Sequence, residues 1–289
     1  MRQLLILSGK GGTGKTTITS AFIKLANAKA YADCDVDAPN LHLVSGWNKE
    51  PLKSNYYGLQ KAEINLDFCI QCNQCKENCR FDAIAYNEEY QINPYACEGC
   101  SVCEFVCPTK AITMVPAVAG ELMLYSDSDK AFSTAQLKMG SGNSGLLVTE
   151  VKKQLKDAAS QDAKVAFIDG SPGIGCPVIA SLAGVDMVLI VAEPSVSGIS
   201  DMQRIIKTAA GFNTKIAVCI NKYDVNKEKT DQIIEICKEQ NLDFVGKIPF
   251  DFQVVHIINS GQNIVDVDCK AGKEVKKVFK KTMDLLLEQ

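Results

Sequence analysis

Eight of the 13 cysteines lie in two runs that share one spacing. In each run the pattern is C-x-x-C-x-x-C-x-x-x-C, a spacing in which three thiolates bind one 4Fe-4S cluster and the fourth binds a second cluster. The spacing therefore predicts two 4Fe-4S clusters. One would be held by Cys69, Cys72, Cys75 and Cys107, and the other by Cys97, Cys100, Cys103 and Cys79.

Zinc sites and disulfides are the alternative explanations for these cysteines. Zinc ribbons pair two C-x-x-C units across a longer loop, whereas each run here adds a third and a fourth cysteine at short steps. Disulfides need an oxidising compartment, and the opening MRQLLILSGKGG lacks the longer apolar core and cleavage site of a secretory signal. We therefore favour iron–sulfur clusters and expect a cytoplasmic protein.

The two runs resemble the bacterial ferredoxin pattern, with one departure. Pro108 follows Cys107 as in that pattern, but Arg80 follows Cys79 where ferredoxins have proline. A cation at this point could raise the potential of the neighbouring cluster. An arginine that simply points into water explains the residue equally well.

A glycine-rich loop follows the first apolar run of the chain. Residues 3–8 read as a strand, residues 9–17 as the loop and residues up to about 27 as a helix. Loop N–H groups and the helix N-terminus would bind phosphate, Lys15 would reach the outer phosphates, and the Thr16 hydroxyl would bind Mg²⁺. A glycine-rich turn without a ligand is the alternative. The expected nucleotide-binding residues are Gly9, Gly11, Gly12, Thr13, Gly14, Lys15, Thr16 and Thr17.

A second lysine, Lys10, distinguishes this loop from a plain Walker A sequence. The run KGGTGKTT resembles the deviant Walker A loop of the superfamily that contains MinD, Mrp, ArsA and the nitrogenase iron protein. In that superfamily the first lysine crosses a dimer interface to the partner's nucleotide. The resemblance implies that Lys10 is catalytic in trans, within a homodimer that sandwiches ATP. Without the resemblance, Lys10 could be a second phosphate contact within its own chain.

Three carboxylates follow the strand expected at residues 30–33. Carboxylates at the carboxyl end of such a strand face the ligand crevice of an α/β sheet. The stretch resembles switch I of the same superfamily, which implies that Asp35 activates or positions the attacking water. Asp33 and Asp37 are candidates for the outer shell of Mg²⁺. Each of the three could instead cap a helix, and for Asp37 we favour that explanation.

Asp169 ends another apolar run, at residues 164–168, and a glycine-rich stretch follows it. This pattern fits a Walker B carboxylate that binds Mg²⁺, followed by a segment that resembles switch II. Cys176 lies seven residues after Asp169. The cysteine that ligates the dimer-bridging cluster of the nitrogenase iron protein has the same offset. We favour a buried apolar thiol, because the second ligand that such a bridge needs has no obvious counterpart.

Two more strands are expected at residues 187–192 and 216–220. Asn221 follows the second and resembles the superfamily residue that binds adenine. The stretch at residues 248–251 resembles the loop that closes over that base, which places Pro249 against the nucleotide. The alternative for Asn221 is a strand-terminal cap of the next turn.

Composition and element order predict the architecture. The chain has 289 residues, 46% of them hydrophobic, and a formal net charge of −3, so it lacks the basic balance of a nucleic-acid binder. No apolar run approaches the ~20 residues that cross a bilayer, so membrane association is not expected. Alternating strands and helices predict a doubly wound, mainly parallel α/β sheet. We assign residues 1–59 and 118–289 to an ATPase domain and residues 60–117 to an inserted ferredoxin-like domain.

Three smaller features complete these expectations. The Gly/Ser-containing stretch at residues 139–145 precedes a helix and reads as a plain surface loop, with contact to a partner as the alternative. The amphipathic C-terminal helix is expected to dock onto the ATPase domain rather than on a membrane. Trp47, Tyr56 and Tyr57 are expected to pack at the junction with the insert.

Taken together, these motifs resemble MinD/Mrp-superfamily ATPases that carry an inserted ferredoxin domain. The resemblance implies a homodimer that binds and hydrolyses ATP to ADP with Mg²⁺ and works with two 4Fe-4S clusters. Its partner would be an unidentified redox or metallocluster protein. We rank three functions in this order: an ATP-gated electron donor, an iron–sulfur carrier or assembly factor, and a MinD-like positioning ATPase with redox-sensing clusters.

Overall fold

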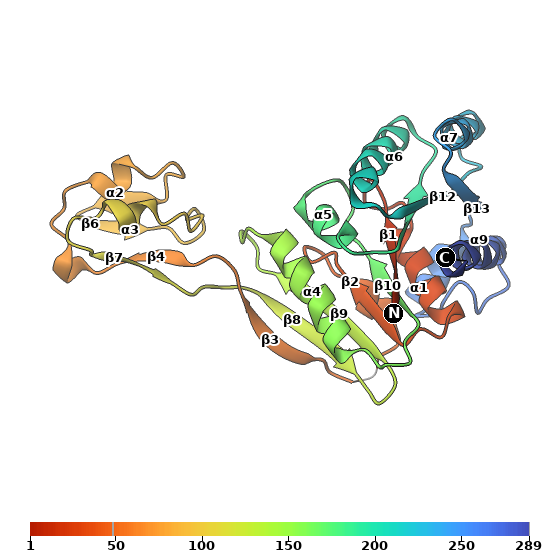
Figure 1. Cartoon of the computed structure of the whole chain (residues 1–289), viewed down its shortest axis with the longest axis horizontal. Coiled ribbons are helices and arrows are strands. Elements are labelled where there is room, and N and C mark those ends of the chain that lie inside the picture. Colours follow the sequence, from red (N-terminus) through yellow and green to blue (C-terminus); the bar gives the residue numbers. More distant parts are fainter. Residues whose placement is uncertain (48, 289) are drawn as a thin grey trace.

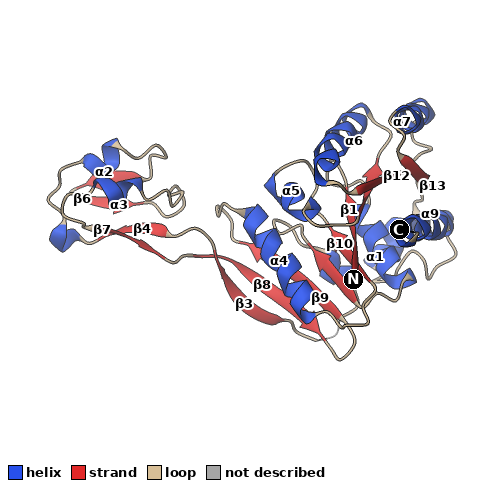
Figure 2. Cartoon of the chain, in the orientation of Figure 1, coloured by secondary structure: helices blue, strands red, loops and turns tan. Residues whose placement is uncertain are grey.

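A nine-stranded sheet forms the body of the molecule, in the order β13-β12-β11-β1-β10-β2-β9-β8-β3. The computed structural model describes residues 1–47 and 49–288. From β13 to β9 neighbouring strands are parallel, whereas β8 runs antiparallel to β9 and to β3 (Figure 2). The expected mainly parallel sheet is thus confirmed. Its strands are β1 (Arg2–Leu7), β2 (Ala30–Asp33), β3 (Leu52–Tyr57), β8 (Val118–Ser126), β9 (Ala131–Leu137), β10 (Val165–Asp169), β11 (Met187–Ala192), β12 (Lys215–Asn221) and β13 (Asp243–Ile248).

Helices cover both faces of this sheet (Figure 1). Residues 4–7 of β1 are apolar because they are buried on both sides of the sheet: Leu5 and Leu7 pack on one face, and Leu4 and Ile6 on the other. The first face carries α4 (Ser144–Ala158), α5 (Cys176–Leu182), α6 (Val196–Ala209) and α7 (Lys227–Glu239). The second carries α1 (Lys15–Leu25), α8 (Gln253–Asn259) and α9 (Lys270–Leu287), and the short helices η1 (Leu41–Val44) and η3 (Ala210–Phe212) complete the body.

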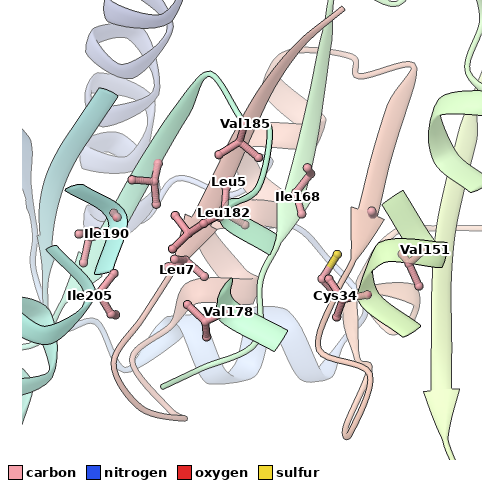
Figure 3. Close-up of a cluster of buried hydrophobic side chains, with 14 of the residues drawn as sticks. Leu5, Leu7, Cys34, Val151, Ile168, Val178, Leu182, Val185, Ile190 and Ile205 are labelled. Carbon is pink, nitrogen blue, oxygen red and sulfur yellow. The ribbon is translucent and has the colours of Figure 1, made fainter. Parts of the chain in front are cut away.

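Side chains from several helices fill the first face of the core. Figure 3 shows Leu5 and Leu7 of β1 beside Val178 and Leu182 of α5. Val151 of α4 belongs to the same cluster and is fully buried. This packing fixes α4 and α5 against the strands that carry the predicted nucleotide site.

An arm of two strands leaves the edge of the sheet and carries a small module (Figure 1). The β3/β8 pair reaches the Tyr57–Val118 register, and β4 (Lys61–Ile64) and β7 (Ile112–Val115) continue the ladder from the Lys61–Val115 register. Between them lie η2 (Leu66–Phe68), α2 (Gln74–Glu77), β5 (Ile84–Asn87), β6 (Glu89–Ile92) and α3 (Val102–Val106). Buried residues of these elements form a separate core cluster. The residues between β3 and β8 therefore fold around a core of their own.

The C-terminal helix docks on the body, as expected. Val275, Val278 and Leu286 of α9 are buried, and Phe279 meets Phe22 of α1 edge to face at 5.1 Å. Within the described residues, no helix is long and apolar enough to cross a membrane.

The position expected for Trp47 is wrong. Its Nε1 donates to the Tyr31 hydroxyl, and its ring lies 5.9 Å from that of Tyr125, so it packs beside the sheet of the body. Tyr56 is buried at the base of the arm, where it pairs with Gly120, and Tyr57 is largely exposed. Only the tyrosine pair therefore lies at the junction.

Candidate functional site

The glycine-rich loop joins β1, in the middle of the sheet, to α1. Gly12 and Gly14 have φ values of 78° and 88°, which only glycine adopts without strain. Gly14 directly precedes the first residue of α1, so the loop delivers the chain to a helix N-terminus. This is the strand–loop–helix geometry on which a phosphate site depends.

Lys15, Thr16 and Asp169 come together behind the loop. Nζ of Lys15 lies 2.8 Å from Oδ2 of Asp169, and the two side chains are only 6% and 0% exposed. The Thr16 hydroxyl donates to the same carboxylate oxygen at 2.7 Å, and the Thr19 hydroxyl donates to the other at 2.7 Å. Three residues predicted to serve phosphate or Mg²⁺ thus share one buried cluster. Sequence reasoning missed Thr19, which sits one helical turn beyond Lys15.

Asp33 ends β2 directly beside Asp169, its register partner on β10. Its carboxylate accepts hydrogen bonds from the backbone N–H groups of Asp35, Asn40 and Leu41 at 2.9–3.0 Å. Burial, and next the charge of Asp169, raise the pKa of Asp33 to about 7. The contacts of Asp33 therefore tie residues 35–41 to the end of β2, while its expected role near Mg²⁺ stays a prediction.

Asp35 and Asp37 follow Asp33 and differ in exposure. Asp35 is half-buried, and burial raises the pKa of its carboxyl although the positive charge of Lys15 opposes the shift. A raised pKa makes the carboxylate a better proton acceptor. Asp37 is exposed, and its backbone carbonyl accepts a hydrogen bond from Nε2 of Gln136. Asp35 is thus the less exposed of the two, and its role with the attacking water stays a prediction.

Lys10 contacts residues of its own chain at the edge of the site. Its Nζ lies 3.4 Å from Oε2 of Glu193 and 3.5 Å from Oγ of Ser197, and the side chain is 37% exposed. Both distances are long for a strong contact, and an exposed ion pair contributes at most about 1 kcal/mol. Lys10 can therefore leave these partners at little cost.

Asn221 and Pro249 line one cavity of about 250 Å³ next to the loop. Nδ2 of Asn221 donates to the Thr13 carbonyl at 2.7 Å, and its Oδ1 accepts from the N–H of Lys222. Nζ of Lys222 donates to the Gly12 carbonyl at 2.9 Å. Asn221 and Lys222 thus brace the loop from the end of β12, and the expected contact of Asn221 and Pro249 with adenine stays a prediction. Sequence reasoning missed Lys222, whose place beside Asn221 was its only signal.

The eight cysteines of the two runs group into two cavities in the module. One cavity is lined by Cys69, Cys72, Cys75 and Cys107, and the other by Cys79, Cys97, Cys100 and Cys103. The fourth cysteine of each run thus lies with the first three of the other run. This crosswise grouping is the one that the spacing predicts.

The two cavities lie at different points along the arm. Ala62 and Met114, which pair across β4 and β7, border the cavity with Cys97. Ile64 and Ile112 pair farther along the same ladder and border the cavity with Cys69. We call the first the proximal cavity and the second the distal cavity. The proximal one is nearer to the body.

The thiols around the two cavities have different surroundings. All cysteines are free of disulfides. Burial raises the pKa of Cys75 and of Cys103. Burial also acts on Cys107, but hydrogen bonds, first from the Ala111 N–H at 3.2 Å, outweigh it and lower the pKa of that thiol. Clusters are held by four thiolates and tuned by such hydrogen bonds.

Sites for a single metal ion are distinct from the two cluster sites. Across residues 1–47 and 49–288, no group of three or more His, Cys, Asp or Glu side chains could hold a metal ion. The fit to clusters rests on the two four-cysteine cavities.

Cys176 differs from its expectation. It is exposed at the start of α5, so the prediction of a buried thiol is wrong. The residue follows the glycine-rich stretch after Asp169, and that stretch ends at the surface of the body rather than in its core. Its backbone lies beside Gly145, at the beginning of α4.

Comparison with known proteins places this geometry in a family. A model described as the CobQ/CobB/MinD/ParA nucleotide binding domain matches residues 4–264. An uncharacterized protein of Methanocaldococcus jannaschii is 32% identical over 293 residues, covering 98% of this chain and 97% of that protein. An iron-sulfur cluster carrier protein of the same organism is 23% identical over 300 residues, covering 98% of this chain and 84% of the relative.

Solved structures show the same fold. The septum site-determining protein MinD complexed with Mg-ADP, from Pyrococcus horikoshii OT3, has a TM-score of 0.59 at 18% identity and covers 99% of this chain and 98% of its own. At that identity the likeness shows the fold alone. The family model and the 32% identical relative go further: this chain belongs to the CobQ/CobB/MinD/ParA nucleotide binding domain family.

Proposed function

We propose that this protein binds and hydrolyses ATP with Mg²⁺ and couples its nucleotide state to electron transfer through two 4Fe-4S clusters. The observation that carries the proposal is the crosswise grouping of eight cysteines into two cavities, on the same chain as a phosphate-binding loop. A nucleotide site alone would support any member of the family. The two cavities would hold clusters whose electron transfer the nucleotide state would regulate.

Hydrolysis would use the cluster of Lys15, Thr16 and Asp169. Phosphate would take over Lys15 from Asp169, and the freed carboxylate and the Thr16 hydroxyl would hold Mg²⁺. Bound Mg²⁺ neutralises charge that develops on the phosphates. Asp35 would orient a water molecule towards the γ-phosphorus, whose bond to the β–γ bridging oxygen breaks to leave ADP and inorganic phosphate. Asn221 and Pro249 would border the adenine.

The working state in this proposal is a homodimer in which Lys10 serves the partner's nucleotide. Support comes from the weak, partly exposed contacts that Lys10 makes with Glu193 and Ser197. A lysine that is not committed to its own site can reach across a two-fold interface. In the monomer, Lys10 would rest against Glu193 of its own chain.

Residues 60–117 would act as a ferredoxin-like domain, inserted into an ATPase domain of residues 1–59 and 118–289. The clusters would supply one-electron transfer, and the four cysteines around each cavity would hold them. The partner would be an unidentified redox or metallocluster protein.

A second candidate function is delivery of iron–sulfur clusters. It is favoured by the relative named as an iron-sulfur cluster carrier protein, which matches 98% of this chain. A delivered cluster has to leave its ligands, whereas a cluster with four cysteines of one folded module should stay. The two functions therefore differ in how firmly the clusters are retained.

The test is an iron and sulfide count on anaerobically purified protein, before and after ATP turnover with an apo-ferredoxin acceptor. Electron transfer predicts about eight iron and eight sulfide per chain, unchanged by turnover. ATP-dependent loss of iron to the acceptor would favour the carrier. Colourless protein that contains zinc would refute both functions.

A further inference from the structure

One segment, residues 136–146, comprises the end of β9, the loop after it and the first turn of α4, and it lies against three functional parts of the molecule. We call it the linking segment. Its middle part, residues 139–145, was expected to be a surface loop, and Met139 is indeed exposed, but the neighbours of this stretch were not predicted. In Figure 1 it extends from the start of α4 towards the module.

The first contact is with the residues that follow Asp35. The N–H of Leu137 donates to the carbonyl of Val36 at 2.8 Å, and Nε2 of Gln136 donates to the carbonyl of Asp37 at 3.2 Å. Asp33 binds the backbone on both sides of these two residues. The beginning of the linking segment is thus hydrogen-bonded to the backbone of residues 36 and 37.

The second contact is with the end of the stretch behind Asp169. A side-chain carbon built on Gly145 would lie 3.2 Å from the carbonyl oxygen of Cys176 and 3.3 Å from its Cβ. These distances leave no room for an intervening group. The end of the linking segment therefore abuts the residue at which the glycine-rich stretch enters α5.

The third contact is with the module. A carbon built on Gly140 would lie 3.4 Å from Cδ1 of Tyr95, and one built on Gly142 would lie 3.6 Å from Oε2 of Glu98. Tyr95 and Glu98 flank Cys97, and Glu98 itself lines the proximal cavity. The middle of the linking segment therefore lies next to the loop that carries Cys97 and Cys100, two of the four cysteines of that cavity.

The distal cavity lies beyond this contact. It is bordered by Ile64 and Ile112, one step farther along the arm than the Ala62–Met114 pair of the proximal cavity. A shift of the linking segment would thus reach residues 95–100 before it reaches residues 69–75. Leu147, Val148 and Val151 anchor the following helix in the core, so the segment moves from a fixed base.

We infer that residues 35–41 and 170–176 respond to nucleotide and that the linking segment transmits this response to residues 95–100, so that the proximal cavity responds to nucleotide and the distal cavity does not. The inference rests on the proposed function and adds the route of coupling and the cluster on which it acts. Such coupling requires an element that both sites bias, and the linking segment touches both.

Hydrogen exchange on the anaerobically purified full chain tests this route, comparing Mg²⁺ with ADP against Mg²⁺ with a non-hydrolysable ATP analogue. We expect exchange rates in residues 93–101 to differ at least about threefold between the two states, and we expect the same of residues 10–17 and 170–176. Residues 66–75 should have the same exchange rates in both nucleotide states.

A double variant, Tyr95→Ala with Glu98→Ala, removes the contact from the module side. Both side chains are exposed, so the fold should persist. The variant should lose the response of residues 93–101 and keep those of residues 10–17 and 170–176. Tyr86→Ala, an exposed tyrosine of β5 in the same module, is the matched control and should keep all three responses.

Three results would overturn the inference while nucleotide binding stands. In the first, the exchange rates of residues 93–101 in the wild type are the same with both nucleotides. In the second, the exchange rates of residues 66–75 change as much as those of residues 93–101. In the third, the double variant keeps the nucleotide-dependent change in residues 93–101. If residues 10–17 fail to respond to either nucleotide, the proposed function itself fails and the inference falls with it.

Discussion

Lys15 and Asp169 hold each other in a buried ion pair, with Nζ 2.8 Å from Oδ2. Each is the group that a phosphate or a Mg²⁺ ion would need. The pair gives two buried charges a partner, and an unpaired charge at this depth would be costly. In the proposed mechanism, binding of Mg²⁺ and ATP exchanges this pair for two new ones, so ligand binding would rearrange the end of β10.

The first prediction follows from that exchange. In Asp169→Asn, the neutral amide is a poor ligand for Mg²⁺, so we expect Mg²⁺ to stop strengthening ATP binding and hydrolysis to fall on the order of 100-fold or more. Calorimetry with and without Mg²⁺ and phosphate release measure the two effects. Glu228→Gln, a highly exposed carboxylate on α7, is the control and should change neither. Full Mg²⁺ dependence in Asp169→Asn would contradict this role.

A mixing experiment tests whether Lys10 acts across the dimer. Lys10→Ala and Asp35→Asn should each abolish hydrolysis alone. If Lys10 acts in trans, a mixed dimer has one complete site, formed by Asp35 of one chain and Lys10 of the other. Random mixing makes about half of the dimers mixed, so about a quarter of the wild-type rate should return. A mixture as inactive as its parents would place Lys10 within its own site.

Substitution by alanine should lower the stability of the protein at Gly9 but not at Gly11. A carbon built on Gly9 would lie 2.1 Å from Cβ of Asp201 on α6, whereas one built on Gly11 meets nothing within 4 Å. Gly9→Ala must displace α6 or the loop, and overpacking of this kind costs about 1–3 kcal/mol. Thermal unfolding without nucleotide should show a lower midpoint for Gly9→Ala and a near wild-type midpoint for Gly11→Ala. Equal midpoints would contradict the observed packing.

The crosswise grouping of cysteines predicts an unusual pattern of thiol protection. In anaerobic Cys107→Ser, the distal cluster loses a ligand, so the thiols of Cys69, Cys72 and Cys75 should become open to alkylation. Those of Cys97 and Cys100 should stay protected, although they are nearer to Cys107 in sequence. Mass spectrometry after alkylation reads out each thiol. Exposure of Cys97 and Cys100 instead would show that each run binds its own cluster.

Features encoded by adjacent residues could be predicted from the sequence. The loop from Gly9 to Thr17 lies between an apolar strand and a helix, and each of these has a strong local signal. The grouping of the cysteines also follows from short spacings. Buried strands that end in a carboxylate, such as β2 and β10, were found for the same reason.

Contacts between distant segments could not be predicted in this way. The Lys222 bond to Gly12 and the packing of Trp47 on Tyr31 depend on which strands become neighbours. The glycines of residues 139–145 predict a surface loop but not its neighbours. Glycine also permits close approach of another segment, and only the tertiary structure shows that the module and α5 lie there.

The central claim is that nucleotide state alters cluster chemistry, and an EPR-monitored redox titration tests it most directly. Anaerobic protein would be titrated with Mg²⁺ and ADP and again with Mg²⁺ and a non-hydrolysable ATP analogue. We predict that the potential of one of two clusters shifts, with a tenfold coupling corresponding to about 59 mV for a one-electron couple. Identical potentials for both clusters in the two nucleotide states would contradict the account.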